Sequence, residues 1–189
     1  LQENFGIEIQ HYVMIDFSTF ATAIDTIFPN GVEMDAQFST IDGQVVSSVE
    51  VPDELGFASG GSPYQTIQVG PQRMDGRTLI NYARYRSDDE GDFGRTRRQQ
   101  EVMSAIMTTK LFTGSEALGK VYALTPTTIS PIFMLTNGLP AALDISNGMV
   151  QTTIPENGDW VEGYDIYDGV GLEIDFEKYS QRLAELGFR

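Results

Sequence analysis

Arginine is concentrated in one part of the chain, around the stretch "YARYRSDDEGDFGRTRRQQ" at residues 82–100. Seven of the twelve cationic residues lie between positions 73 and 98, and none of the seven is lysine. They are Arg73, Arg77, Arg84, Arg86, Arg95, Arg97 and Arg98. Arginine carries a permanent charge on a planar fork that binds phosphate or carboxylate oxygens bidentately, whereas lysine acts as a solvated point charge. The cluster therefore predicts an anion pocket, with phosphate or pyrophosphate as its natural occupant.

The spacing of these arginines indicates how they would share a pocket. Arg84 and Arg86 are two residues apart, so in an extended segment both side chains point to one face while Tyr85 packs the other way. A long helix is predicted from about residues 92–94 to residue 111, with Arg95 and Gln99 on one face of its first turns. The N-terminus of that helix would add backbone N–H donors and a partial positive charge.

The acidic residues of the same stretch allow a plainer interpretation. Asp88, Asp89, Glu90 and Asp92 lie between the arginines and could neutralise them in surface ion pairs. Such pairs contribute little to stability and require no ligand. Composition alone supports the two interpretations equally.

The order of residues in the cluster resembles the signature of the LytR-CpsA-Psr family. The matching block is Arg84-x-Arg86 followed by Asp92-x-x-Arg95-x-x-Arg98-Gln99-Gln100. The segments "YVMIDFSTFATAIDTIFPNGVEM" and "MDGRTLINYARYR" also resemble the family, and the resemblance is specific over about residues 12–110. It implies an α/β or mixed α+β fold, with helices on both sides of a mixed central sheet in three layers. Residues 1–189 are expected to form a single catalytic domain that lacks its N-terminal part.

The resemblance also implies an activity, a glycopolymer phosphotransferase. Such an enzyme passes teichoic acid or capsular polysaccharide from a polyprenyl (pyro)phosphate carrier to peptidoglycan, at the extracellular face of the cytoplasmic membrane of chiefly Gram-positive bacteria. Members of the LytR-CpsA-Psr family were once described as transcriptional attenuators related to the cell envelope. A non-catalytic extracellular module that binds polyprenyl phosphate or a glycan is the alternative.

The resemblance assigns roles to individual residues. Arg84, Arg86 and Arg95 are expected to grip the pyrophosphate and to act in catalysis, while Gln99 orients it. Asp92 is expected to position the arginines or to cap the helix, and Arg98 is included among the substrate-binding residues, on the helix or just outside the pocket. Mg²⁺ is the expected cofactor. Its carboxylate ligands, one further arginine and a membrane anchor are expected upstream of this chain, so no metal ligand is assigned within it.

Two apolar helix faces are candidates for sheltering a lipid tail. Burial of methylene groups is favourable by roughly 0.8 kcal/mol each, so a polyprenyl chain would be stabilised in a tunnel lined by such faces. The candidate lining residues are Phe17, Phe20, Ile24, Val102 and Ile106. Ordinary core packing is the alternative for each of them.

The elements that must position these side chains can be read from periodicity. Residues 7–17 alternate as a strand and run into a helix with Ser18 as its cap, which "FPNG" at residues 28–31 ends. A short strand follows, and glycine and proline between residues 39 and 70 indicate hairpins and a surface loop.

The second half of the chain is predicted to continue this mixture of strands and helices. Asp75 is expected to cap a helix that leads to the arginines. After Gly114 a helix and then a strand are predicted, and Asp175 is expected to cap a terminal helix packed through Phe176, Tyr179, Leu183 and Leu186. Mixed strands and helices favour an α/β or α+β fold.

Composition excludes several other classes of function. A formal net charge of −15 repels nucleic acid, which argues against a DNA-binding regulator. The chain has no cysteine and one histidine, His11, so thiol chemistry and a multi-histidine metal site are not available. Acidic residues in loops could bind calcium, but they lack EF-hand spacing, and solvated acids are the favoured interpretation. These residues are Asp35, Asp42, Asp53 and Glu54.

Overall fold

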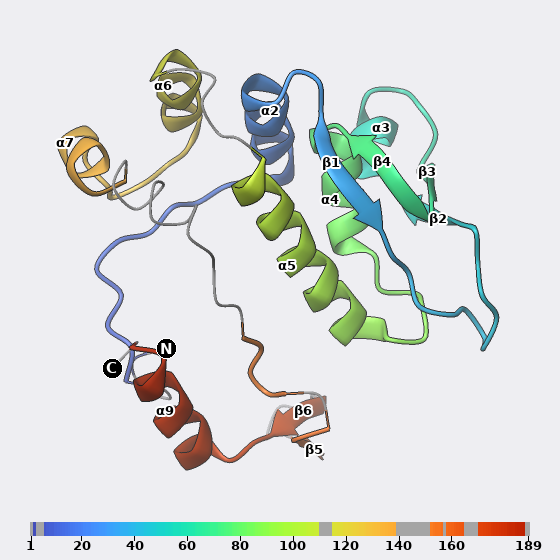
Figure 1. Cartoon of the computed structure of the whole chain (residues 1–189), viewed down its shortest axis with the longest axis vertical. Helices are drawn as coiled ribbons and strands as arrows, with labels where there is room; N and C mark the ends of the chain where they lie inside the picture. The colour runs from blue at the N-terminus through green and yellow to red at the C-terminus, as the bar shows by residue number, and fades with distance from the viewer. Residues whose placement is uncertain are drawn as a thin grey trace. The chain divides into compact units, whose positions relative to one another are not determined.

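The structure, a computed structural model, describes residues 2, 6–109, 115–138, 152–156, 158–164 and 170–187 (Figure 1). The chain divides into two compact units. One unit is Val13–Met149, and the other combines Leu1–Tyr12 with Val150–Arg189. The prediction of a single domain over residues 1–189 stays a prediction.

The unit Val13–Met149 contains two antiparallel pairs of strands. β1 (Val32–Ala36) pairs with β4 (Gly70–Met74), and β2 (Ser48–Pro52) pairs with β3 (Tyr64–Gln68). A single residue separates β3 from β4, yet the two strands pair with different partners. The chain therefore changes sheets at this point.

Helices form the rest of this unit as the structure describes it. They are α2 (Phe17–Ile27), α3 (Glu54–Ala58), α4 (Gly76–Arg84), α5 (Gly91–Thr108), α6 (Ser115–Leu124), α7 (Pro131–Phe133) and the π-helix η1 (Met134–Gly138). Helix α4 is central, because it packs against α2 and α5 and also contacts β2, β3 and β4 (Figure 1). Among the residues that the structure describes, none of the helices combines the length and the hydrophobicity of a transmembrane span.

The hydrophobic core joins both strand pairs to these helices. In β1 the residues alternate between buried and exposed, as expected of a strand with one face toward a core. The buried core residues are Ile24, Phe28, Val32, Met34, Ala36, Val49, Val51, Ile67, Met74, Leu79, Tyr82, Tyr85 and Val102. The core therefore includes the end of α4 and the residue that follows it, next to the predicted pocket.

The unit formed by both chain ends contains a hairpin and the terminal helix. β5 (Val161–Tyr164) pairs antiparallel with β6 (Val170–Glu173), and α9 (Phe176–Glu185) follows. Tyr179 and Leu183 of α9 are buried as predicted, whereas Phe176 is half exposed.

Helix caps were predicted with mixed success. The carboxylate of Asp75 accepts from the backbone N–H of Thr78 at 2.8 Å, and that of Asp175 accepts from Lys178 at 3.0 Å, so both predicted caps are confirmed. The predicted cap of α2 is wrong: Asp16, not Ser18, caps this helix by accepting from the N–H of Thr19 at 2.7 Å. The end of α5 predicted at about residue 111 is too late, because the helix ends at Thr108 and Thr109 adopts extended angles.

Two predicted strands are not formed. Residues 7–15, all of which the structure describes, contain one isolated bridge, between Val13 and Thr127, because alternation alone supplies no partner strand. The strand predicted after α6 is replaced by α7 and η1. Ser130 caps α7 by accepting from the N–H of Phe133, and Pro131 occupies a first-turn position that favours a helix start.

The mixed α+β class is confirmed. Within the described residues the strands form three antiparallel pairs rather than one mixed central sheet between helices. β2 and β3, like β5 and β6, are consecutive strands, whereas β1 and β4 are separated along the chain by the β2–β3 pair. The helices that carry most of the arginine cluster, α4 and α5, both belong to the unit Val13–Met149.

Gly76 permits the close approach of α2 and α4. Its N–H donates to Oδ1 of Asp25 at 2.8 Å, and a Cβ added at residue 76 would lie 2.3 Å from the carbonyl oxygen of Ala21. We expect Gly76→Ala to lower the free energy of unfolding by about 1–3 kcal/mol, because a backbone atom would have to move. Urea unfolding measures this change. Gly119→Ala is the matched control, since nothing lies within 4 Å of a Cβ there; an equal loss in both variants would contradict the steric explanation.

Candidate functional site

Arg84 is the last residue of α4 and lies at a surface shared with α2 and α3. Its Nη2 lies 2.7 Å from Oε1 of Glu54, and its Cζ lies 4.1 Å from the ring centroid of Phe17. The predicted extended geometry is wrong for Arg84, because the helix continues through it and only Tyr85 adopts extended angles. Arg84 thus ends a helix, and Arg86 follows it after the one extended residue Tyr85.

A second ion pair ties α3 to the same helix. Nη2 of Arg77, two turns before Arg84, lies 3.3 Å from Oδ2 of Asp53. The carboxylate of Asp53 is buried, and it caps α3 by accepting from the N–H of Gly56. The hydrogen bond and charge of Arg84 hold the pKa of Glu54 below its ordinary value. Asp53 and Glu54 thus pair with arginines. The described residues contain no group of three or more acidic, histidine or cysteine side chains that could hold a metal ion.

Arg86 is the exception within the cluster. Six of the seven arginines form ion pairs, whereas Arg86 is exposed and has no ion pair or hydrogen bond to any residue that the structure describes. The ion-pair interpretation therefore accounts for most of the cluster but not for Arg86. A free guanidinium beside Arg84 in sequence is available to an anion from solvent.

Helix α5 presents the other predicted pocket residues. Arg95 lies 2.9 Å from Oδ1 of Asp92 in the first turn, and its Nε is buried without a hydrogen-bond partner. Gln99, one turn further on, is exposed. Asp92 thus lies where it restrains Arg95, and it does not cap the helix, because the cap residue Glu90 precedes the helix and makes no side-chain cap bond.

Arg98 is not placed where a ligand can reach it, which corrects its prediction as a substrate-binding residue. Its side chain is fully buried and lies 2.6 Å from Oδ2 of Asp88, which is buried as well. The physical reason is helical spacing, since Arg98 precedes Val102 by four residues and so lies on the buried face of α5. The neighbouring Arg97 instead pairs with Glu90, which precedes α5, and with Glu101 of α5.

The acidic turn between α4 and α5 binds a loop that sequence reasoning did not connect to it. The carboxylate of Asp89 accepts from the hydroxyl of Thr40 at 2.6 Å and from the N–H groups of Asp42 and Gly43. These bonds, that of Thr40 above all, lower the pKa of Asp89. The Asp-Gly pair at residues 42–43, both with positive φ, is the sequence signal for this tight turn. The acids therefore position the loop rather than only neutralising arginines.

The residues predicted to line a lipid tunnel lie in and around the core. Ile24 and Val102 are core members, and Phe20 and Ile106 are partly buried against the same core. Phe17 differs, because nearly half of it is exposed (46%) beside Arg84. Core packing, the alternative interpretation, thus describes the positions of Ile24 and Val102.

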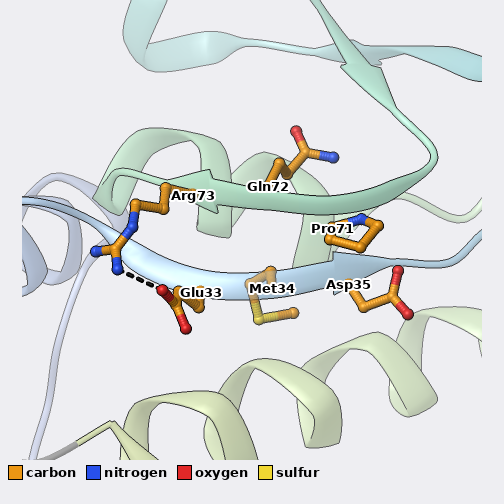
Figure 2. Close-up of a pocket in the computed structure, with 6 residues that line it drawn as sticks. All are labelled: Glu33, Met34, Asp35, Pro71, Gln72 and Arg73. Atoms are coloured by element: carbon orange, nitrogen blue, oxygen red, sulfur yellow. Dashed lines mark hydrogen bonds and ion pairs between the residues drawn. The ribbon is translucent and has the colours of Figure 1, made fainter.

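A pocket of about 440 Å³ lies elsewhere, on the β1–β4 pair. Figure 2 shows its lining residues, with the ion pair between Glu33 and Arg73 at one end and Asp35 at the other. The two carboxylates outnumber the single guanidinium, which disfavours an anion. None of the predicted pyrophosphate-binding residues lines this pocket.

Comparison with known proteins identifies relatives along the whole chain. The LytR_cpsA_psr family model matches residues 1–183. Regulatory protein MsrR of Staphylococcus aureus is 29% identical over 163 residues, which is 86% of this chain and 38% of that protein. The polyisoprenyl-teichoic acid–peptidoglycan teichoic acid transferase TagV of Bacillus subtilis is 26% identical over 187 residues, 97% of this chain and 43% of that protein. The chain thus spans about two fifths of the length of these relatives.

Solved structures share the fold at lower identity. The crystal structure of B. subtilis TagV matches with a TM-score of 0.64 at 20% identity, covering 97% of this chain and 66% of that one. A structure of TagT bound to LIIa-WTA matches with a TM-score of 0.62 at 17% identity, covering 98% and 65%.

Proposed function

The chain belongs to the LytR-CpsA-Psr family, and from this premise we propose that it forms the pyrophosphate-binding part of a glycopolymer phosphotransferase. The enzyme would pass teichoic acid or capsular polysaccharide from a polyprenyl (pyro)phosphate carrier to peptidoglycan. The relative TagV, named as a teichoic acid transferase, and the TagT structure bound to LIIa-WTA support this proposal.

The observation that carries the proposal is the arrangement of Arg84 and Arg86 at the end of α4. Arg84 is held by a carboxylate that is itself 64% exposed, and Arg86 is unpaired among the described residues. Exposed ion pairs are worth only about 0–1 kcal/mol, so a multiply charged pyrophosphate can displace Glu54 at little cost. Arg95 on α5 would add a third guanidinium, and Gln99 an amide.

Charge neutralisation is the main requirement of the proposed reaction. An acceptor hydroxyl of peptidoglycan forms a bond to the phosphorus that carries the polymer and releases its proton to solvent. The bond from that phosphorus to the bridging oxygen breaks, and polyprenyl phosphate leaves with the electron pair. Arginines around the pyrophosphate stabilise the charge that develops on the leaving oxygens.

Magnesium is proposed as the cofactor, but its ligands are not assigned in this chain. Mg²⁺ is usually held by one or two carboxylates together with substrate phosphates, and the described residues contain no group of three or more acidic, histidine or cysteine side chains that would hold a metal ion by itself. No step of the reaction is therefore derived through the metal. The extracellular face of the membrane, and attachment to it through an anchor outside this chain, are likewise proposals that follow from the proposed lipid-linked substrate.

A transfer assay tests the proposed function. The full-length protein is incubated with a radiolabelled glycopolymer on polyprenyl pyrophosphate and with peptidoglycan oligosaccharides. We expect label to appear in a phosphodiester on the oligosaccharide. Binding of the carrier without transfer would favour the non-catalytic binding module, and absence of binding would overturn both.

Removal of the carboxylate that pairs with Arg84 should strengthen anion binding. Because Glu54 competes with pyrophosphate for the same guanidinium, we expect Glu54→Gln to raise the affinity for geranyl pyrophosphate by about two- to fivefold, the equivalent of one exposed ion pair. Isothermal titration calorimetry measures this affinity. Glu33→Gln is the matched control, since Glu33 pairs with Arg73 on the β1–β4 sheet. An equal gain in both variants would indicate a general effect of net charge instead.

A further inference from the structure

Arg98 bonds to two separate points of the connection between α4 and α5. Its Nη1 donates to Oδ2 of Asp88 at 2.6 Å, and its Nη2 donates to the backbone carbonyl of Tyr85 at 2.6 Å. A longer contact of 3.4 Å joins Nη2 to Oδ1 of Asp88. One side chain of α5 thus holds both the first residue after α4 and the acidic turn that follows.

The surroundings of this guanidinium restrict it further. Its Cζ lies 5.4 Å from the ring centroid of Tyr85 and 5.6 Å from that of Phe38, and these two rings meet edge to face. The carboxylate of Asp88 also accepts from the N–H of Ser39 at 3.1 Å. Tyr85 is therefore held by its backbone carbonyl and by its ring, and it has little freedom to move.

Stability alone does not explain a buried charged pair in this place. Two desolvated ions are often no more stabilising than apolar side chains of similar volume. A planar fork bonded to two fixed acceptors does, however, define an orientation. The orientation that matters here is that of Tyr85, because it separates Arg84 from Arg86, while Arg95 lies one turn before Arg98 on α5.

From this geometry we infer that Arg98 and Asp88 form a positioning clamp, which sets Arg84 and Arg86 against Arg95 for binding of a pyrophosphate. Arg98 itself touches no ligand. The inference rests on the proposed function, because it gives the clamp a role in the same anion site. Arg98 is thus not a fourth ligand-binding arginine but a positioning residue that fixes the spacing of Arg84, Arg86 and Arg95.

The test measures binding of geranyl pyrophosphate to the full-length protein by calorimetry. The clamp is removed in the double variant Arg98→Met with Asp88→Asn, which leaves no buried charge unpaired and keeps an acceptor for Ser39. We expect affinity to fall about tenfold or more, because misplacement of binding groups by about 1 Å has effects of this order. Arg97→Met is the matched control, since Arg97 pairs with Glu90 and Glu101 and not with the connection at Tyr85; its affinity should stay unchanged.

A second arm separates positioning from a general loss of structure. If the clamp acts through Arg86, removal of the clamp in an Arg86→Ala background should weaken pyrophosphate binding far less than it does in the wild-type background. The losses caused by removal of the clamp and by Arg86→Ala would then be coupled. Additive losses would overturn the clamp. If the double variant does not fold by circular dichroism, Arg98→Lys, which keeps the buried charge but not the planar fork, is used in the same cycle with the same expectation.

The outcomes distinguish the inference from the proposed function. Wild-type binding that survives removal of the clamp in a folded variant overturns the inference and leaves the proposed function standing. Absence of binding by the wild-type protein overturns the proposed function, and the clamp with it. Coupled loss, with Arg97→Met unchanged, supports both.

Discussion

The double variant Arg84→Ala with Arg86→Ala is expected to lose pyrophosphate binding almost completely. Each arginine would contribute a charge-assisted hydrogen bond worth about 1.5–3 kcal/mol, so the pair should account for a loss in affinity of about 100-fold or more. Calorimetry with geranyl pyrophosphate measures this loss, and the transfer assay should show a parallel loss of product.

The same variant should remain folded. Glu54, the ion-pair partner of Arg84, is largely exposed, and Arg86 has no partner among the described residues, so the free energy of unfolding should change by about 1 kcal/mol or less. Arg73→Ala is a control from the same cluster, because Arg73 lies on β4, before the start of α4, and pairs with Glu33. Unchanged affinity in the double variant, or an equal loss in the control, would remove the pyrophosphate site from the end of α4.

Local signals made part of this fold predictable. Asp75 and Asp175 each precede a helical pattern by one residue, and an aspartate in that position satisfies free N–H groups of the first turn. The alternation of β1 likewise follows from one buried face. Such features depend on a few neighbouring residues, so they can be recognised without knowledge of the tertiary structure.

Features that depend on distant partners were not predictable in the same way. Residues 7–15 alternate like a strand, but pairing requires a second strand, which alternation does not specify. The helix at Pro131 was missed although Ser130 and the proline are both start signals. Helix ends are also weakly encoded, which is why Arg84 was assigned to an extended segment when it ends α4.

Arg98 shows how charge can mislead when periodicity is ignored. Its charge suggested a ligand contact, but Arg98, Val102 and Ile106 follow one another at intervals of four, on the stripe that faces the core. The partner Asp88 lies ten residues away, and the carbonyl of Tyr85 thirteen, so neither contact follows from helical spacing. The stripe could have shown that Arg98 is buried, and the structure was required to show what it binds.

Arg98→Ala should be among the most destabilising single substitutions in the chain. It would leave the carboxylate of Asp88, which is 0% exposed, without its counter-ion and with the N–H of Ser39 as its remaining partner in the described structure. Removal of one member of a buried pair costs about 3–5 kcal/mol, and urea unfolding measures this loss. Arg97→Ala, at the neighbouring position, removes partly exposed ion pairs, and it should lower the free energy of unfolding by about 0–1 kcal/mol.

The double variant Arg98→Met with Asp88→Asn separates charge burial from position. It should recover most of the stability lost in Arg98→Ala, to within about 2 kcal/mol of wild type, because no unpaired charge remains buried. If Arg98→Ala costs no more than Arg97→Ala, the pair with Asp88 behaves as a surface pair and does not hold the connection at Tyr85. A double variant that regains stability but not pyrophosphate affinity would show that the guanidinium of Arg98 acts on the position of Arg84 and Arg86. The reason is that apolar packing of the introduced methionine can replace the contribution of Arg98 to folding, but it cannot replace the hydrogen bond from Nη2 of Arg98 to the carbonyl of Tyr85.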